Sequence, residues 1–250
     1  MAEVKFPTEV VDLPSKGLLY PESSPLSTGK IEIKYMTARE EDILTSANLI
    51  KKGIVVDKLI EALIIDKSIK VEDLLLGDKN AILIASRVLA YGKDYEVEVN
   101  GQNVTVDLTT LSDRKLDKSL VINGANEFEF ELPNSKNIIH FKILTHADEV
   151  EIQKELKGYE KLEKITGVSS GLTTRLKHQI VSVDNDSDQK VIDNFIDNNF
   201  LALDHRAYRD YYDEVSPDIE LKFDYTSQAG NLHRLDVPLG SEFFWPAARK

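Results

Sequence analysis

The side chains best suited to chemistry in this sequence are its five histidines. No two of them stand three or four residues apart, the spacing at which one helix presents two metal ligands. A site assembled from distant parts of the chain remains open, but the spacing favours ordinary core or surface roles for each. The five are His140, His146, His178, His205 and His233.

One acidic run, residues 184–188, begins like a calcium-binding loop, with side-chain oxygens at its first, third and fifth positions. The pattern then fails, because Gln189 stands where the sharp turn needs glycine and Phe195 stands where a bidentate glutamate is needed. We therefore expect an acidic, solvated loop that also caps the helix after it.

The N-terminal segment 1–29 contains four prolines and two glycines, which exclude a regular helix and predict an extended arm with turns. Within it, Leu13-Pro14-Ser15-Lys16-Gly17 has the lysine and glycine of a phosphate loop but lacks the second glycine and the required order. We expect a turn that lays the arm on the domain surface. The alternative is a docking arm for another subunit, in which Lys16 and Tyr20 are candidate partner-binding residues.

Known catalytic signatures are missing from the sequence. It has no Gly-x-Ser-x-Gly elbow, Walker loop, dinucleotide fingerprint or His-Glu-x-x-His motif. It also has no cysteine, which excludes disulfides, thiolate zinc sites and a cysteine nucleophile. We therefore predict no catalytic residue, no cofactor and no metal site, and expect a protein that is not an enzyme. An enzyme with an unrecognised site is the remote alternative.

The charge balance is acidic, with 31 Lys plus Arg against 43 Asp plus Glu and a formal net charge of −12 over 250 residues. Such a chain repels phosphate backbones unless a basic patch is segregated, and none is evident, so we do not expect a nucleic-acid partner. The opening residues lack the apolar core of a secretion signal, and no apolar stretch is long enough to span a membrane. We expect neither standard export nor membrane insertion, and the lack of cysteine favours an intracellular site of synthesis.

Helices are expected to dominate the segment that follows a half-buried strand at residues 30–35. Thr37 and Glu40 form a capping box, so a helix should begin at Thr37, and Gly53 supplies its stop. A second helix is expected from about Asp57 to Ile65. Asp78 is the expected N-cap of a third, whose residues 82–89 are apolar nearly all round and should form the centre of the N-terminal core.

The rest of the chain alternates hairpins with helices. Asn100-Gly101 predicts a type I′ turn between strands at 95–99 and 104–106. Further hairpins are expected over 128–144 and 219–239, and further helices over 145–165, 171–183, 188–200 and 202–215. Leu172, Leu176 and Ile180 should share one buried helix face, and Val191, Ile192, Phe195 and Ile196 another.

The predicted fold is α+β, with helical blocks and small antiparallel hairpins. Its expected parts are an extended arm (1–29), an N-terminal lobe (30–111), a connector (112–127) and a C-terminal lobe (128–250). Residues 31–42 and 139–150 share a strand, an apolar residue, a capping threonine and an acidic first turn. This predicts two structurally similar halves. The alternative, that such junctions look alike anywhere, stays open.

Two further groups of residues could bind partners. Arg206, Arg209, Tyr211 and Tyr212 are of the types that dominate interface hot spots, although packing within their own domain is favoured. The second group, Phe243, Phe244, Trp245 and Pro246, places three large rings near the C-terminus. We favour a core anchor for it over an exposed protein-binding plug.

Several stretches resemble the baseplate hub and hub-assembly proteins of contractile-tailed bacteriophages of the T-even type. The resemblance spans nearly the whole chain and is most specific in the N-terminal third. It rests on 13–21, 36–46, 49–53, 77–81, 201–204 and 243–246. Some members of that family carry Cys-x-x-Cys in the two hairpins that match Asn100-Gly101 and Gln228-Ala229-Gly230, and this chain has no cysteine, which puts a metal in doubt.

The resemblance implies a non-enzymatic role in building the central hub of the tail baseplate, through binding to other hub or tail proteins. It implies assembly in the host cytoplasm and a place in the virion tail if the protein is retained. The alternative is a tail assembly chaperone or adaptor that does not stay in the virion. Oligomeric state, copy number and the surface used are left open.

Overall fold

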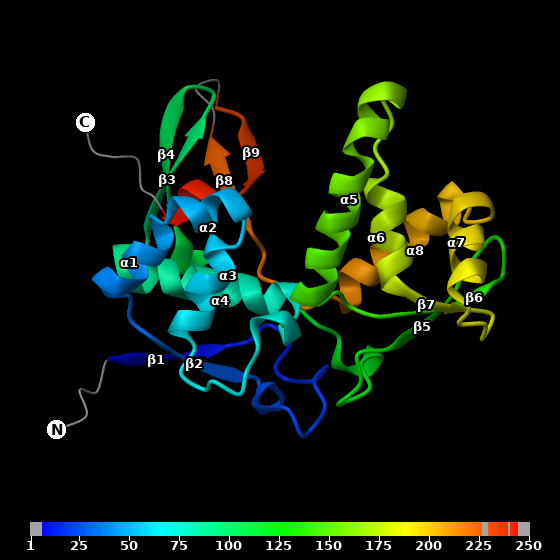
Figure 1. Cartoon of the computed structure of the whole chain (residues 1–250), viewed down its shortest axis with the longest axis horizontal. Coiled ribbons are helices and arrows are strands. Elements are labelled where there is room, and N and C mark those ends of the chain that lie inside the picture. Colours follow the sequence, from blue (N-terminus) through cyan, green and yellow to red (C-terminus); the bar gives the residue numbers. More distant parts are fainter. Residues whose placement is uncertain (1–6, 227–229, 240, 245–250) are drawn as a thin grey trace.

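The computed structural model describes residues 7–226, 230–239 and 241–244. The chain has the expected α+β fold, in which helices surround small antiparallel sheets of two or three strands. Figure 1 shows two groups of elements along the longest axis, one built around α1–α4 and the other around α5–α8. One continuous hydrophobic core contains residues of both groups.

The first group begins with a hairpin whose second strand was expected. Strand β1 (Thr8–Asp12) pairs antiparallel with β2 (Lys30–Lys34), and Val11 lies opposite Ile31 on the buried face. The loop between them contains the 3-10 helix η1 (Pro25–Thr28). Its Leu13, Leu19 and Leu26 are buried, so the expected surface position of this arm is wrong. Turns fold the arm back on the molecule, so that its apolar side chains are buried and removed from water.

The helix expected over 37–53 is two helices. The capping box of Thr37 and Glu40 is present and starts α1 (Ala38–Leu44), and Gly53 ends α2 (Ala47–Lys52) with a positive φ of 72°. The break falls at Thr45 and Ser46. The Thr45 hydroxyl donates to the carbonyl of Glu41 (2.9 Å), a local bond that competes with the helical pattern.

Two more helices complete this group. Helix α3 (Val55–Leu63) buries Leu59, Ile60 and Leu63, and the short η2 (Val71–Asp73) leads to α4 (Leu76–Tyr91). The expectation that Asp78 caps α4 is wrong, because the helix begins two residues earlier and Asp78 lies in its first turn. Residues 81–84 are all buried, which confirms the helix as the centre of this core.

The Asn100-Gly101 hairpin is confirmed. Strands β3 (Asp94–Val99) and β4 (Gln102–Asp107) pair antiparallel, and both turn residues have the positive φ of a type I′ turn. The connector that follows contains the short helices η3 (Leu108–Thr110) and η4 (Lys118–Leu120).

The second group contains a three-stranded sheet in the order β5-β6-β7 and four helices. The helix expected over 171–183 ends at Gln179, because Ile180–Val183, in which three of four residues are β-branched, forms β7 and pairs with β6. The other helices match their expected positions within a few residues. The elements are β5 (Phe128–Glu131), β6 (Ile138–Phe141), α5 (His146–Thr166), α6 (Gly171–Gln179), α7 (Gln189–Asn198) and α8 (Ala202–Val215).

The last elements return to the first group. Strands β8 (Lys222–Thr226) and β9 (Leu232–Asp236) form the third expected hairpin, which lies beside β3–β4 in Figure 1. The Tyr225 hydroxyl donates to Gln102 (3.3 Å), and Phe243 in η5 (Ser241–Phe244) packs edge-on against Tyr95 at 5.1 Å. The expected C-terminal lobe, 128–250, therefore spans both groups.

The elements of the two halves follow the same order, which supports their predicted similarity. A hairpin leads to a capped helix, then to further helices and a final hairpin, in residues 8–108 (the first half) and again in 128–237 (the second half). The C-cap residue of α3, Ile64, bridges to Ile33 of β2, and the C-cap residue of α6, Ile180, pairs with Phe141 of β6. Such long-range contacts go beyond the resemblance of two strand-to-helix junctions.

The correspondence extends to a buried aspartate. Asp78 is the third residue of α4 and Asp204 the third of α8. Asp78 accepts the backbone N–H of Ser15 (2.9 Å), and Asp204 accepts that of Asn134 (2.8 Å). Both bonds hold a Leu-Pro turn that leaves the preceding strand, and a lysine with positive φ follows in each turn.

Candidate functional site

The first turn of α4 joins four separate segments of the chain. Gly77 lies against residues 217–218, Asp78 holds the 13–20 arm, Lys79 reaches α3 and α5, and Asn80 donates to Asp218 (3.0 Å). These residues open one of the stretches on which the family resemblance rests. The structure thus assigns that stretch a role in holding the two groups of elements together.

Gly77 permits the closest of these approaches. A Cβ atom at this position would lie 1.9 Å from the carbonyl oxygen of Pro217 and 2.7 Å from the Cα of Asp218. Both are backbone atoms that no side-chain rotation can move. Only glycine allows the N-terminal end of α4 to contact residues 217–218, which follow α8.

Asp78 is fully buried and accepts three hydrogen bonds. The donors are the backbone N–H of Ser15 (2.9 Å), the Ser15 hydroxyl (2.7 Å) and the Tyr20 hydroxyl (2.7 Å). Burial raises the pKa of Asp78 above its usual value, although the bonds from Ser15 and Tyr20 oppose the shift. The network anchors the arm, so Tyr20 is a buried structural residue.

Lys79, His146 and Asp57 form a compact polar cluster between the two groups. Lys79 Nζ lies 2.7 Å from Asp57 Oδ1 and 3.0 Å from His146 Nδ1, and His146 Nε2 lies 2.9 Å from the same Asp57 oxygen. Because an ammonium can only donate, Nδ1 of His146 accepts from Lys79 and Nε2 donates to Asp57. Burial raises the pKa of Asp57, but the bonds from His146 and Lys79 outweigh it and hold it below its usual value.

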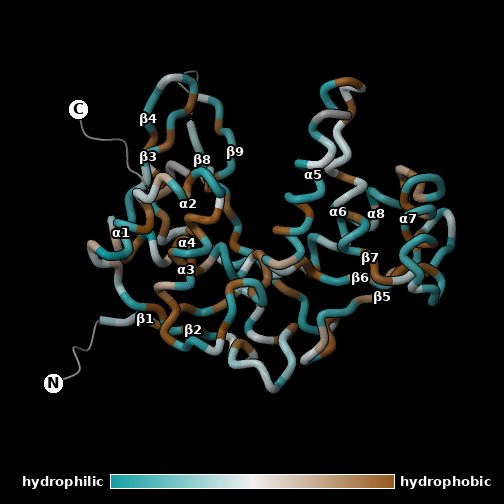
Figure 2. Tube along the Cα trace, in the orientation of Figure 1, coloured by the Kyte–Doolittle hydropathy of each residue, from teal (hydrophilic) through white to brown (hydrophobic). Residues whose placement is uncertain are grey.

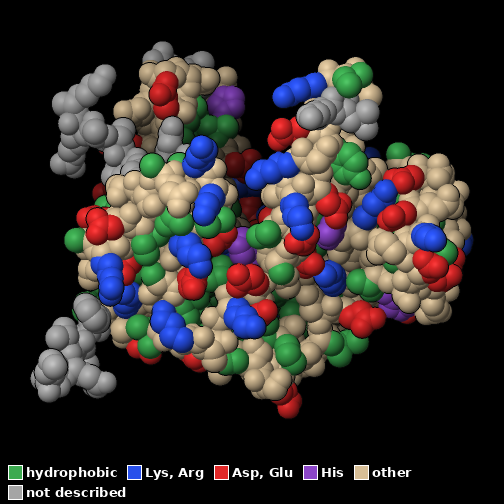
Figure 3. Space-filling view, in the orientation of Figure 1, with side chains coloured by type: hydrophobic (Ala, Val, Ile, Leu, Met, Phe, Trp, Pro, Cys, Tyr) green, Lys and Arg blue, Asp and Glu red, His purple; other side chains and the backbone are tan. Residues whose placement is uncertain are grey.

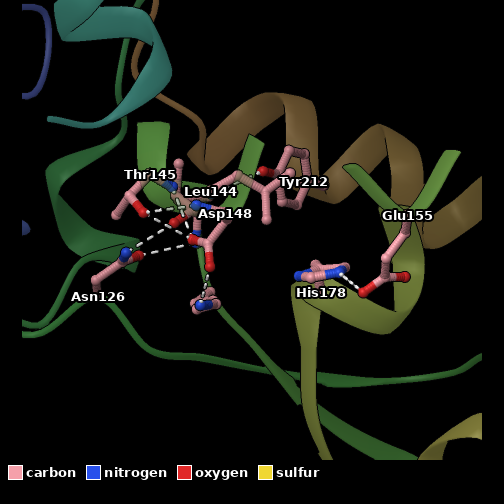
Figure 4. Close-up of polar contacts among 9 residues, drawn as sticks. Asn126, Leu144, Thr145, Asp148, Glu155, His178 and Tyr212 are labelled. Atoms are coloured by element: carbon pink, nitrogen blue, oxygen red, sulfur yellow. Dashed lines mark hydrogen bonds and ion pairs between the residues drawn. The ribbon is translucent and has the colours of Figure 1, made fainter. Parts of the chain in front are cut away.

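The start of α5 supplies the other side of this contact (Figure 4). Thr145 and Asp148 form a capping box, in which the Asp148 carboxylate accepts the N–H and the hydroxyl of Thr145 at 2.9 Å each. Asn126 holds the backbone of Ile143 through both of its amide atoms, and Leu144 N–H donates to the Tyr212 hydroxyl (3.3 Å). The junction is therefore fixed by side chains from before β5 and from α8.

A cleft of about 530 Å³ opens beside this junction. Its lining combines aliphatic and tyrosine side chains with three arginines, one histidine and two aspartates. The chain has eight arginines in all, so this one cleft gathers a large share of them in an acidic protein. The charged and polar members are Arg114, Arg175, Arg209, His205, Asp213, Asp218, Gln179 and Ser216, and the apolar and aromatic members include Leu144, Leu172, Leu176, Tyr208 and Tyr212.

The three arginines are partly exposed, and each has an acidic neighbour. Arg175 lies 2.9 Å from Glu149, whereas the Arg114–Glu220 and Arg209–Asp210 distances are 3.9 and 3.6 Å. The two longer contacts leave N–H groups of Arg114 and Arg209 able to meet a further acceptor. Burial and the Arg209 charge lower the pKa of His205, which favours the neutral imidazole. The cleft is thus suited to a carboxylate flanked by apolar groups.

The structure separates the residues expected to bind partners. Tyr211 stacks on Phe130 at 4.8 Å and Tyr212 bonds to Leu144, which confirms that the tyrosines of α8 pack within the protein. Arg206 and Arg209 stay exposed, and Arg209 lines the cleft. Lys16 is exposed and pairs with Asp113 at 2.5 Å.

The C-terminal aromatic residues divide in the same way. Phe243 and Phe244 are buried, and the carbonyl of Phe243 accepts from Arg87 Nε (2.9 Å), which confirms the expected core anchor for these two. Trp245 and Pro246 lie outside the described residues.

The helical pattern in the sequence predicted the wrong environment for Leu172. It was expected on a buried helix face, but it is 55% exposed at the wall of the cleft. Val191, expected to be buried, is also exposed. Nearby, Ile165 and Val168 are exposed at the end of α5, where Figure 2 shows an apolar segment at the tip of the helix. An exposed apolar side chain at the wall of a cleft, such as Leu172, is typical of protein-binding surfaces.

Two aspartates of the acidic loop 184–188 have structural roles. Asp188 caps α7, as expected, and Asp184 holds the start of β6 by accepting the N–H of Ile138 (2.8 Å). Among the described residues, His, Cys, Asp and Glu form no group of three that could hold a metal ion. No helix in this part of the chain is both long and apolar enough to cross a membrane.

Comparison with protein-family models, with curated proteins and with solved structures found no match.

Proposed function

We propose that this chain is a structural or assembly protein of the baseplate hub in a contractile-tailed bacteriophage. It acts by binding other hub or tail proteins, and it performs no reaction. Hub assembly would take place in the host cytoplasm.

The family part of this proposal rests on the resemblance, and the positions of the resembling stretches support it. Residues 13–21 and 77–81 meet at the start of α4, Asp204 holds the 133–136 turn, and Phe243 anchors the chain end. These residues set the shape of the molecule. Stretches with such roles suit a protein whose task is to present surfaces to its neighbours.

The protein-binding part rests on one observation, the arginine-lined cleft with Leu172 exposed at its wall. Its lining combines apolar and tyrosine side chains with partly exposed guanidinium groups, residue types found at the centre of many interfaces. On the face drawn in Figure 3, positive and negative side chains are intermixed over the surface. Mixed charges of this kind suit a protein partner better than a polyanion.

A complementation experiment tests the function. A phage whose copy of this gene carries a stop codon should produce heads but no complete tails, and the wild-type gene supplied from a plasmid should restore them. Arg209→Glu combined with Leu172→Asp should fail to restore tails while the purified variant keeps the circular dichroism of the wild type. Normal tails without the protein would refute the proposed function.

Retention in the virion separates the hub subunit from the assembly factor. Quantitative mass spectrometry of purified virions should find a hub subunit at a fixed copy number. An assembly chaperone or adaptor would be present in infected cells and absent from virions.

A further inference from the structure

The two halves of the molecule meet through a short antiparallel bridge. Leu76 N–H donates to the carbonyl of Leu144 (3.2 Å), and His146 N–H donates to that of Leu74 (2.8 Å). Leu75 and Thr145 therefore face each other across the bridge, and Leu75 is only 1% exposed. We call residues 74–76 the α4 edge and residues 144–146 the α5 edge.

Each edge has a counterpart in the other half. Leu75 stands three residues before Asp78, as Leu201 stands before Asp204, so residues 200–202 correspond to the α4 edge. Thr145 caps α5 as Thr37 caps α1, so residues 36–38 correspond to the α5 edge. We call these counterparts the α8 edge (200–202) and the α1 edge (36–38).

Both counterparts are open. Leu201 is 50% exposed, whereas its equivalent Leu75 is buried by the bridge. In the described part of the chain, the N–H groups of Ala202 and Ala38 and the carbonyls of Phe200 and Met36 have no hydrogen bond. These are the four groups equivalent to those that form the bridge inside the molecule. Each edge thus exposes the same pattern of one donor and one acceptor.

The two open edges lie at opposite ends of the molecule. Figure 1 shows α1 at one end of the longest axis and α7, which directly precedes the α8 edge, near the other. They cannot meet within one chain. A second copy, placed next to the first, would offer the missing edge at either end.

We propose that copies of this chain associate head to tail, with the α8 edge of one copy pairing with the α1 edge of the next. The contact repeats the antiparallel bridge between the α4 and α5 edges, and it buries Leu201 beside Met36 and Thr37. Because the two surfaces differ, the contact is heterologous and forms a closed ring or an open filament, depending on the rotation between copies. Two backbone hydrogen bonds and one leucine make a weak contact, so association depends strongly on protein concentration.

Cross-linking tests this contact in the full chain, because the natural sequence has no cysteine. Leu201→Cys and Met36→Cys variants are mixed and treated with a short bismaleimide. The mixture should give a covalent pair in several-fold higher yield than either variant alone. Leu232→Cys, which replaces another exposed leucine, serves as the matched control with Met36→Cys. Equal yields in the test and control mixtures, or efficient pairing of Leu201→Cys with itself, would overturn the proposal.

Sedimentation velocity provides a second measurement without a cross-linker. The weight-average sedimentation coefficient of the wild type should rise between micromolar and millimolar concentration. It should stay constant for Leu201→Asp and rise as in the wild type for Leu232→Asp. Because both leucines are exposed, neither change should disturb the fold. A wild type that stays monomeric over this range, or an unchanged rise for Leu201→Asp, also rejects the contact.

Discussion

Asp78 and Asp204 occupy the same position in the two halves and hold the same kind of turn, yet their surroundings differ. Asp204 accepts three N–H groups from Asn134 and Ser135, and these outweigh the effect of burial, so its pKa lies below the usual value. Asp78 accepts one N–H and two hydroxyls, and burial dominates, so its pKa is raised. The same position in the fold thus lowers the pKa of the aspartate in one half and raises it in the other.

The helix starts around these aspartates differ in the same way. The first turn of α4 is covered by residues 217–218 and by the α5 edge, whereas the first turn of α8 is open and Leu203 is 67% exposed. The comparison shows that a repeated local sequence sets where elements begin. The neighbours of each element then decide which side chains are buried.

The largest effect on stability is expected at Gly77, where the first turn of α4 is most closely covered. Gly77→Ala should destabilise the protein by at least about 3 kcal/mol, because the new methyl group overlaps the Pro217 backbone. Leu203→Ala, at the equivalent position of α8, should change stability by less than about 0.5 kcal/mol. Urea denaturation followed by circular dichroism measures both. A small cost for Gly77→Ala would show that α4 does not approach residue 217 this closely.

The two aspartates should give opposite pH dependences. Asp78→Asn and Asp204→Asn should each cost about 2 kcal/mol near neutral pH, because an amide cannot accept all the bonds that a carboxylate accepts. The folded pKa of Asp204 is lowered, so its contribution is present above about pH 4 and is lost as the pH falls toward the folded pKa. The cost of Asp204→Asn should therefore shrink in acid.

The sign reverses for Asp78. Its folded pKa is raised, so the wild type gains stability on protonation as the pH falls through that pKa. The cost of Asp78→Asn should therefore grow in acid and shrink as the pH rises. Denaturation of both variants and the wild type between pH 3 and 8 gives the two slopes. Parallel slopes would contradict the comparison.

The two capping threonines should differ moderately. Thr37→Ala should cost about 1 kcal/mol, the usual value for a lost helix cap. Thr145→Ala should cost about 2 kcal/mol, the upper end of that range, because Thr145 also faces Leu75 in the bridge between the halves. Serine at each position keeps the hydroxyl and is the matched control. Equal costs would mean that the bridge adds nothing to the second cap.

The smallest effects are expected for the lysines that pair with the capping carboxylates. Lys34 lies 2.7 Å from Glu40 and Lys142 lies 2.6 Å from Asp148, and the first pair is the more buried. Lys34→Met should cost about 1 kcal/mol and Lys142→Met about half as much, since exposed pairs are screened by solvent. Thermal denaturation at two salt concentrations measures both, and the Lys142 effect should fall more with added salt. The reverse order would show that burial does not set their strength.

Local signals in the sequence predicted the caps and turns. Thr37, Thr145 and Asp188 start helices, and Asn100-Gly101 closes a hairpin, because each of these choices is made within a few residues. The same rule failed for Asp78, because its carboxylate accepts hydrogen bonds from Ser15 and Tyr20 and does not cap the helix. Residues 180–183 fitted a helical pattern in the sequence, but they form a strand because they pair with the free edge of β6.

The candidate site could not be predicted from the sequence. The cleft combines residues from α4, α6, α8 and the connector, and of these only Arg209 and Tyr212 were expected to bind partners. Its arginines are ordinary surface residues when taken singly. Leu172 followed a buried pattern on α6, and its exposure depends on where the neighbouring helices end.

The packing of Phe243 against Tyr95 joins two residues that are far apart in the sequence. During synthesis, the hairpin β3–β4 emerges more than a hundred residues before the hairpin that covers it. The apolar side of the earlier hairpin therefore stays uncovered until the later hairpin has been made. A chain cut before Lys222 would lack the contacts that Tyr225 and Phe243 make with this hairpin.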